Sequence, residues 1–466
     1  MSSIDGKRTA GDRLGTAPLK GLIFSMALPT VAAQLVNLLY NLVDRVYVGH
    51  IPGEGAMALA GLGITFPVVI MVTAFSNLIG MGGASRASIV MGEGNRQQAE
   101  KILGNCMFLV LVLSIALSAF FMLFKEPVLR AFGASDVTLP YADDYLGVYL
   151  MGTFFVMAAL SLNPFITNHG FAKTSMLTTC IGAVLNIALD PVFIYVLGMG
   201  VKGAAAATVI SQAVSALWVL AFLRSRRSGL KLRLADMKPD RTIIWAVVSL
   251  GISPFVMSST ECLIQLTFNQ GMVRYGNDMY VSLMSIMFSI NQAVWMPMQG
   301  FAQGVQPIIG YNYGAGNVKR VWKSFYVMLA VCLSFSVLMV GLVVIWPEFY
   351  LSLFTSEQEL VDLGRLPMRI FMFGMMFMGA QSSCQQTFLG LGQAKISVFI
   401  ALLRKVILLW PLAMILPRIA NMGVWGLYLA EPVSDTISAT TCTIVFFVYV
   451  KKLLAKREQE MSEKGV

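Results

Sequence analysis

The sequence is poor in charge. Of its 466 residues only 12% are Asp, Glu, Lys or Arg, whereas soluble domains usually carry about 25%. Uncharged apolar runs recur instead, at the length of about 18 residues or more that is needed to cross a bilayer core. A transmembrane β-barrel would show short alternating segments. We therefore predict an all-α integral membrane protein in contact with the lipid bilayer.

Histidine and cysteine patterns argue against metal and redox chemistry. The two histidines, His50 and His169, lie far apart in the sequence, so we expect no histidine metal site. The six cysteines lie singly in apolar segments without CxxC spacing, which is typical of small buried hydrophobic residues. The chain also lacks a GxxxxGK[ST] P-loop. We predict that it is not an enzyme and needs no cofactor, and that any pumping uses an energy source other than its own ATPase.

Apolar runs bounded by glycine, proline and charge predict twelve transmembrane helices. The first six spans are placed at 22–47, 57–84, 102–124, 143–167, 174–197 and 203–223. The second six are placed at 243–272, 281–310, 325–346, 366–389, 396–417 and 424–449. The predicted domains are an N-terminal segment (1–21), an N-lobe (22–223), a basic linker (224–242), a C-lobe (243–449) and a C-terminal tail (450–466).

The positive charges gather in a few connecting segments. The net charge is +10, and the longest basic run is "RSRRSGLKLRLADMKPDR" at 224–241. Cytoplasmic loops are enriched in Lys and Arg, so this pattern predicts a plasma-membrane protein with both termini in the cytoplasm. It gives no reason to expect nucleic-acid binding. The N-terminus lacks the apolar core of a signal peptide, so we expect the first span to direct insertion.

The two sets of six spans repeat each other. "GEGNRQQAEKI" begins at Gly92 and "GAGNVKRVWKS" at Gly314, and "NHGFAKTSM" begins at Asn168 and "GLGQAKISV" at Gly390, a separation of 222 residues in both cases. "MGVKGAAAATVIS" and "MGVWGLYLAEPVS" are separated by 223 residues. With six spans each, both halves enter the membrane in the same sense. This indicates two lobes related by a pseudo-two-fold axis along the membrane normal, an arrangement found in secondary transporters.

Longer motifs carry a family resemblance. They are "NLVDRVYVG" in the first span, "GVQPIIGYNYGAGN" at 304–317 and "GAVLNIALDPVFIYVLGMGVKGAAAATVISQ" at 182–212. In these the chain resembles the multidrug and toxic compound extrusion (MATE) family, particularly its MepA-like bacterial branch. The resemblance implies a twelve-helix antiporter that exports amphipathic, often cationic, compounds against an inward flux of H⁺ or Na⁺.

Charged residues inside apolar spans are candidates for the coupling-ion site. An Asp at the centre of a membrane helix costs roughly 2.5–3.5 kcal/mol, so Asp44 should face protein or water. Asn186 lies one helical turn before Asp190 and shares its face. The resemblance implies that Asp44, Asn186, Asp190 and Thr208 bind H⁺ or Na⁺. The alternatives are a structural ion pair for Asp44 and a helix-end role for Asp190. Asn163, in the fourth span, is a further candidate for the same site.

The C-lobe offers a second set of candidates. Glu261 and Gln265 share one face of the seventh span and are candidates for receiving a cationic substrate, with a structural role as the alternative. The tenth span lacks the Asp that some family members use there, so a complete Na⁺ site is not expected in this lobe. Met368, Met372 and Met375 of the tenth span are candidates for a substrate surface. An internal charge network is predicted from Arg404, Lys405, Glu431 and Asp435. Methionines in a membrane helix more often serve plain packing or lipid contact, which is the alternative for these three.

These features predict a cation-coupled exporter working by alternating access, with Pro29 as a hinge in the first helix because proline permits bending. No metal ion other than Na⁺ at Asp44, Asn186 and Asp190 is expected, and the absence of a large soluble domain favours a functional monomer. One alternative is a flippase for a lipid-linked saccharide or an exporter of another amphipathic metabolite. Another is a channel or receptor, which the repeated six-helix halves argue against.

Overall fold

The computed structural model describes residues 10–225, 227–355 and 357–463, and the regular elements of this part of the chain are all helices. The outermost residues of the two predicted terminal segments, Arg226 of the linker and Ser356 lie outside the described residues. The all-α fold predicted from the sequence is confirmed.

The N-terminal half is built from helices that all end before residue 225. They are α1 (Ala10–Thr16), α2 (Leu19–Gly49), α3 (Gly55–Gly92), α4 (Arg96–Leu123), α5 (Lys125–Ala131), α6 (Leu139–Met151), α7 (Thr153–Asn168), α8 (Ala172–Pro191), the π-helical turn η1 (Val192–Val196) and α9 (Gly200–Arg224).

A short 3₁₀ turn, η2 (Leu234–Met237), lies in the linker. The C-terminal half comprises α10 (Arg241–Tyr275), α11 (Asp278–Gly314), α12 (Val318–Ile345), α13 (Pro347–Ser352), α14 (Gln358–Phe373), the 3₁₀ turn η3 (Gly374–Phe377), α15 (Met378–Gly390), α16 (Ala394–Leu402), the π-helical segment η4 (Leu403–Leu409), α17 (Trp410–Ile415), the 3₁₀ turn η5 (Leu416–Asn421) and α18 (Val424–Glu463).

Each of the twelve predicted spans coincides with helix. Ten helical segments of the described chain are long and apolar enough to cross a membrane. The predicted fourth span is the pair α6 and α7, bent by 60° at Gly152, where a side chain would collide with Val209. The predicted tenth span is α14, η3 and α15, and it is not among the ten because α15 is rich in glutamine and serine.

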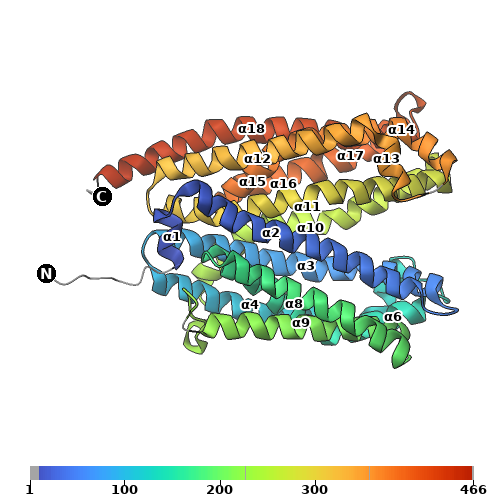
Figure 1. Cartoon of the computed structure of the whole chain (residues 1–466), viewed down its shortest axis with the longest axis horizontal. Helices are drawn as coiled ribbons and strands as arrows, with labels where there is room; N and C mark the ends of the chain where they lie inside the picture. Colours follow the sequence, from blue (N-terminus) through green and yellow to red (C-terminus); the bar gives the residue numbers. More distant parts are fainter. Residues whose placement is uncertain (1–9, 226, 356, 464–466) are drawn as a thin grey trace.

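Figure 1 shows the N-terminal helices, in blue and green, lying beside the C-terminal helices, in yellow to red. The larger core of the N-terminal half runs from Val48 to Val247, and the C-terminal half packs around a separate core that reaches Leu454. α2 contributes to both, because Leu22 and Met26 pack in the second core and Val48 in the first. The first helix therefore joins the two halves.

One end of the bundle carries both ends of the described chain and the linker, and we call it the terminal face (Figure 1). The linker is fixed there to α4. Asp240 donates its backbone N–H to Asn105 Oδ1 at 2.8 Å, and Lys231 donates its own to Glu100 Oε1 at 3.2 Å. α1 is fixed to the C-terminal half, since Asn312 Nδ2 donates to Leu14 O at 3.0 Å.

The two halves are in contact along the part of the bundle nearest the terminal face. Side-chain hydrogen bonds join Gln306 Nε2 to Ser85 Oγ (2.6 Å), Gln34 Nε2 to Gln303 Oε1 (3.0 Å) and Asn77 Nδ2 to Ser258 Oγ (3.1 Å). Phe75 and Phe255 stack edge to face beside them, with 4.9 Å between ring centroids. Among the described residues, side-chain bonds between α2 or α3 and the C-terminal helices are confined to this part of the bundle.

The glycines that open the repeated sequence motifs allow this close approach. A Cβ on Gly92 would collide with the carbonyl oxygen of Tyr311, and one on Gly314 would collide with that of Ile89. The α3 and α11 backbones therefore touch where each helix ends. We call this contact, together with the three side-chain hydrogen bonds, the gate.

The last helix is longer than predicted from the apolar pattern. α18 continues from the predicted end at residue 449 to Glu463. Its extension, "KKLLAKREQEMSE", is made of strong helix formers, and Arg457 and Lys456 both pair with Glu460. The predicted hinge residue, Pro29, lies inside the continuous helix α2.

Candidate functional site

Two buried carboxylates lie together in the N-terminal half, beyond the gate. Asp44, on α2, is 9% exposed, and Asp190, near the end of α8, is 0% exposed. The two helices pack against each other, and the charge of Asp44 acts on Asp190. Asp44 Oδ1 and Asp190 Oδ2 have no hydrogen-bond partner among the described residues. We call Asp44 and Asp190 the carboxylate pair.

Amide and hydroxyl groups surround Asp190. Asn186 Nδ2 donates to Asp190 Oδ1 at 3.2 Å and lies 3.4 Å from Thr208 Oγ1 on α9. The i,i+4 spacing places Asn186 and Asp190 on one helical face, as the sequence predicts. Asn186 Oδ1 is buried without a partner, so an oxygen atom remains available to a proton donor or a cation.

Tyrosines complete this environment. Tyr40, one turn before Asp44, is close enough to interact electrostatically with both carboxylates, and Tyr145 of α6 interacts with Asp44 and Thr208. Our sequence analysis missed both tyrosines. The spacing of Tyr40 and Asp44 was the available signal for one of them, whereas Tyr145 comes from a distant helix.

Asn163 lies apart from these residues. Its Nδ2 donates to the backbone oxygen of Ser175 at 3.2 Å. Ser175 precedes Asn186 by three turns of α8, which corresponds to about 16 Å along the helix axis. The structure therefore brings together four of the five predicted ion-site residues and places the fifth nearer the terminal face.

Arg45 does not neutralise the pair by direct contact. Its guanidinium carbon lies 5.5 Å from the ring centroid of Phe66, in cation–π geometry. Adjacent residues of a helix point about 100° apart, which explains why Arg45 and Asp44 diverge. Like charges buried close together repel each other unless a proton or a cation neutralises them, so the pair is chemically suited to binding one.

A second charged cluster lies in the C-terminal half. Arg404 Nε donates to Asp435 Oδ1 at 2.8 Å, and its Nη2 lies 3.6 Å from Glu431 Oε1. Lys405 Nζ donates to Glu261 Oε2 at 2.9 Å. Arg404 and Lys405 lie in the π-helical segment η4, and such segments frequently occur at functional sites. Of the predicted charge network, Arg404 lies beside both Glu431 and Asp435, whereas Lys405 pairs with Glu261 on α10.

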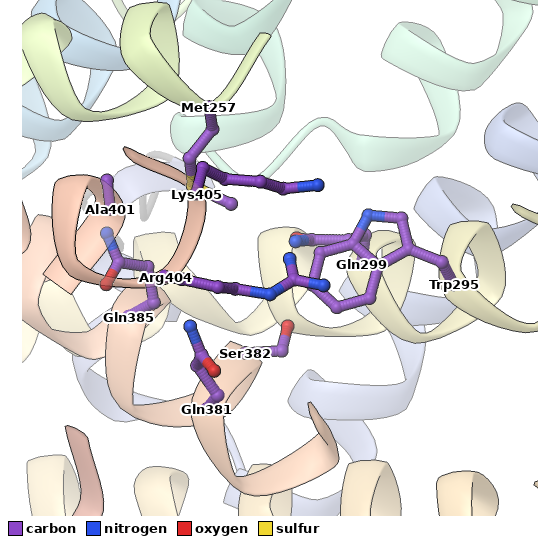
Figure 2. Close-up of a pocket in the computed structure, with 9 residues that line it drawn as sticks. All are labelled: Met257, Trp295, Gln299, Gln381, Ser382, Gln385, Ala401, Arg404 and Lys405. Atoms are coloured by element: carbon purple, nitrogen blue, oxygen red, sulfur yellow. The ribbon is translucent and has the colours of Figure 1, made fainter. Parts of the chain in front are cut away.

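A narrow pocket opens beside this cluster. Figure 2 shows the Arg404 guanidinium extending toward Trp295 and Gln299 of α11, with Gln381 and Ser382 of α15 beside it. The lining residues come from five helical segments and are Met257, Trp295, Gln299, Gln381, Ser382, Gln385, Ala401, Arg404 and Lys405. The available signal for the α15 residues was the polar run "QSSCQQT" inside an apolar span.

The other predicted substrate residues do not line this pocket. Met368, Met372 and Met375 are buried in the core of the C-terminal half, where they pack against other side chains. Gln265 lies half-buried one turn beyond Glu261. In this conformation the methionine that lines the pocket is Met257.

Metal-ion coordination would need ligands other than the usual set. No group of three or more His, Cys, Asp or Glu side chains in the described part of the chain is placed to hold a metal ion. A monovalent cation at the carboxylate pair would therefore use amide, hydroxyl or water oxygens as its remaining ligands.

Solved structures of MATE transporters share this fold. A transporter crystallised in complex with MaD3S superposes with a TM-score of 0.89 at 23% identity, covering 97% of this chain and 100% of that one. A multidrug resistance MATE family transporter of the MOP superfamily in its outward-facing conformation gives the same TM-score and coverage at 22% identity.

Curated relatives match over nearly the whole chain. The multidrug export protein MepA of Staphylococcus haemolyticus (strain JCSC1435) is 24% identical over 415 residues, which is 87% of this chain and 89% of the relative. MepA of Staphylococcus aureus (strain MSSA476) is 24% identical over 419 residues, with 89% and 91% covered. The MatE family model matches residues 29–192 and again 255–415, one match in each half. Because these two matches cover well over half of the sequence, the chain belongs to the MatE family of multi-pass membrane transporters and is not an enzyme.

Proposed function

We propose that this protein is a multidrug exporter that expels amphipathic compounds from the cytoplasm in exchange for H⁺ or Na⁺. The observation that carries the proposal is the carboxylate pair, Asp44 and Asp190, which lies buried between packed helices with unpartnered oxygen atoms. Buried acidic residues in membrane helices typically mark ion pathways and proton relays. The relatives in Staphylococcus are named multidrug export proteins, which agrees with export of several compounds.

The closed gate supports alternating access. In our proposal the terminal face is cytoplasmic, as the basic linker and tail suggest. The gate then closes the cytoplasmic side, and the carboxylate pair and the pocket lie beyond it on the outward side. A rocking motion of one half against the other would break the gate and expose these sites to the cytoplasm.

Ion binding and the motion are linked through α2. This helix carries Asp44 against α8 and also carries Gln34, which bonds to Gln303 across the gate. Neutralising the carboxylate pair removes repulsion between α2 and α8, so it changes the packing of the helix that also joins the two halves. Substrate leaves outward while the ion is bound, and the ion leaves after the protein turns inward.

The available energy is sufficient for concentrative export. Moving one elementary charge through 100 mV contributes about 2.3 kcal/mol. A tenfold ion gradient contributes about 1.4 kcal/mol more. Together they support a substrate gradient of several hundredfold for each ion exchanged.

Efflux from proteoliposomes under separately imposed pH and Na⁺ gradients tests the proposal. We expect one of the gradients to drive efflux of an amphipathic dye by the wild-type protein, and Asp44→Asn to abolish it without loss of folded protein. Asp143→Asn is the matched control, because Asp143 is 40% exposed and pairs with Lys125 outside the carboxylate pair. Normal gradient-driven efflux by Asp44→Asn would refute the coupling role.

A further inference from the structure

The pocket of the C-terminal half presents positive charge. Arg404 and Lys405 line it, and none of its described lining residues is acidic. The carboxylates beside these two cations do not line the pocket: Asp435 and Glu431 lie 2.8 Å and 3.6 Å from Arg404, and Glu261 lies 2.9 Å from Lys405. A cationic group entering the pocket would therefore meet two cations first.

The aromatic surface of the pocket is also occupied. The guanidinium carbon of Arg404 lies 5.5 Å from the ring centroid of Trp295 (Figure 2). The face of a Trp ring is the strongest cation–π acceptor among side chains. Because Arg404 covers it, Trp295 offers a ligand apolar contact rather than a free site for a quaternary ammonium.

Unused hydrogen-bonding groups remain in the pocket. The Lys405 ammonium has three N–H donors, and in the described chain Glu261 Oε2 is the acceptor at 2.9 Å. Gln381 Oε1, Ser382 Oγ and Gln385 Oε1 are buried without a partner among the described residues. Buried donors and acceptors are costly to leave unpaired, so the pocket suits a ligand that supplies both an anionic oxygen and a donor group.

The pocket lies directly beyond the gate. Ser258, next to Met257 of the pocket, bonds to Asn77 of α3, and Gln303, one turn after Gln299, bonds to Gln34 of α2. A ligand in the pocket therefore rests on the side chains that close the bundle. When the gate opens, the pocket becomes accessible from the terminal face.

We propose that this pocket binds the carboxylate of amphipathic substrates, with Lys405 and Arg404 as its donors and Trp295 and Met257 as its apolar wall. The inference rests on the proposed export function and specifies its substrate class: zwitterionic or anionic compounds with a free carboxylate are preferred over purely cationic ones. Glu261 then competes with the substrate for Lys405, and substrate binding releases Glu261 from its ion pair.

Two dyes with the same fluorophore test this assignment. Rhodamine 110 has a free benzoate and is zwitterionic, whereas rhodamine 123 is its cationic methyl ester. Binding of both to purified protein in detergent can be measured by fluorescence anisotropy without any ion gradient. We expect wild type to bind rhodamine 110 more tightly. Lys405→Gln should weaken its binding about tenfold, the usual effect of losing a charge-assisted hydrogen bond, while changing the affinity for the ester much less.

The partner substitution should have the opposite sign. Glu261→Gln frees the Lys405 ammonium, so we expect it to tighten rhodamine 110 binding. The double variant Glu261→Gln/Lys405→Gln leaves no unpaired charge and should bind rhodamine 110 as weakly as Lys405→Gln does. Lys395→Gln is the matched control, because Lys395 is exposed on α16, the helix that leads into η4. Size-exclusion profiles establish that every variant is folded.

Three results would overturn the proposal. The first is that wild type binds rhodamine 123 more tightly than rhodamine 110 and Glu261→Gln weakens the binding of rhodamine 123. The second is that rhodamine 110 does not bind, and the third is that Lys395→Gln loses as much rhodamine 110 binding as Lys405→Gln. The proposed antiport is judged separately by efflux. If the binding pattern holds but no gradient drives efflux, coupled export is wrong and the carboxylate pocket stands. If efflux is gradient-driven but the binding pattern fails, the pocket assignment alone is wrong.

Discussion

Arg457 and Glu93 form an ion pair between the two halves, with 3.5 Å between Nη2 and Oε1. The same guanidinium donates to Gly314 O at 3.0 Å and lies over the ring of Tyr313. Since Arg457 belongs to the extension of α18 and Glu93 follows α3, the pair can form only while the halves meet at the terminal face. The extension thus fastens the gate from outside.

Arg457→Ala should favour opening at the terminal face. An exposed ion pair contributes about 0.2–1 kcal/mol and a charge-assisted hydrogen bond about 1.5–3 kcal/mol, so the open population should rise at least severalfold. Electron–electron distance measurements between spin labels at the exposed positions Gln97 and Lys323 report the separation. Lys456→Ala is the control, because Lys456 is 76% exposed and pairs only weakly with Glu460. Identical distance distributions in wild type and Arg457→Ala would contradict a fastening role.

Gly314→Ala should have a similar effect from inside the gate. The added Cβ collides with the backbone of α3, which cannot yield as a flexible side chain would. Overpacking of this kind typically costs about 1–3 kcal/mol, and here the cost falls only on the closed gate. Gly341→Ala makes the same change in α12 with open space around the new Cβ. We expect the spin-label distance to lengthen in Gly314→Ala alone, and an equal change in Gly341→Ala would show that the gate contact is not responsible.

The sequence predicted local relationships and left long-range ones open. The twelve helices follow from apolar runs, and the contact between Asn186 and Asp190 follows from their spacing on one helix. The repeated motifs at Gly92 and Gly314 were visible as a repeat, but their meeting depends on how the halves pack. The same holds for the partner of Lys405, because nothing in the local pattern distinguishes Glu261 from an acid on another helix.

The polar composition of α15 gave a signal that our sequence analysis did not use. Gln381, Ser382 and Gln385 are unusual in a membrane span, and each lines the pocket. The methionines of the same predicted span, which we took as candidates, are in a membrane helix more often explained by packing. A polar group in a membrane helix needs a partner, whereas a methionine needs only apolar neighbours, so the polar residues were the stronger indicator of a cavity.

The ion pairs of Arg404 should contribute unequally to stability. Asp435 Oδ1 accepts a hydrogen bond from Arg404 at 2.8 Å, whereas Glu431 Oε1 is 3.6 Å away, too far for one. Breaking a buried ion pair costs about 3–5 kcal/mol, so Asp435→Asn should lower the thermal unfolding temperature of the purified protein markedly. Glu431→Gln removes a like charge beside Asp435, so the variant's stability should stay within about 1 kcal/mol of wild type. The lost attraction between Glu431 and Arg404 is offset by the lost repulsion between Glu431 and Asp435. Equal destabilisation by both variants would argue against this division.

His169 should make stability depend on pH. The residue follows α7 outside the spanning helix, is 2% exposed, and burial lowers its pKa from 6.5 to about 4, with Arg96 acting in the same direction. Above about pH 6.5 the imidazole is neutral in the folded and unfolded states. Between pH 6.5 and 4 this imidazole is protonated in the unfolded chain but stays neutral in the folded protein. The free energy of unfolding therefore falls by up to about 3 kcal/mol as the pH is lowered.

Thermal unfolding in detergent between pH 7 and 4 checks this expectation. His169→Gln should reduce the loss of stability on acidification. His50→Gln is the control, because His50 is exposed at the end of α2. An unchanged pH dependence in His169→Gln would show that burial of this imidazole does not contribute.

Asp190→Asn and Asn186→Ala should separate the two coupling ions. Asp190 is the acid in contact with Asn186, so Asp190→Asn should abolish efflux driven by either gradient. A proton needs only the carboxylate, whereas Na⁺ needs several oxygen ligands, and Asn186 Oδ1 is a buried oxygen without a partner. We therefore expect Asn186→Ala to keep pH-driven efflux and to lose Na⁺-driven efflux, measured in the same proteoliposomes.

Asn163→Ala supplies the comparison for that experiment. It removes the same type of side chain, but from a residue that binds Ser175 O, about 16 Å along α8 from Asn186. If the ion is held by the carboxylate pair and its neighbours, Asn163→Ala should change the ion dependence of efflux much less than Asn186→Ala. A larger effect at Asn163 would move the coupling site toward the terminal face, to the space between α7 and α8, and would leave the carboxylate pair with a structural role.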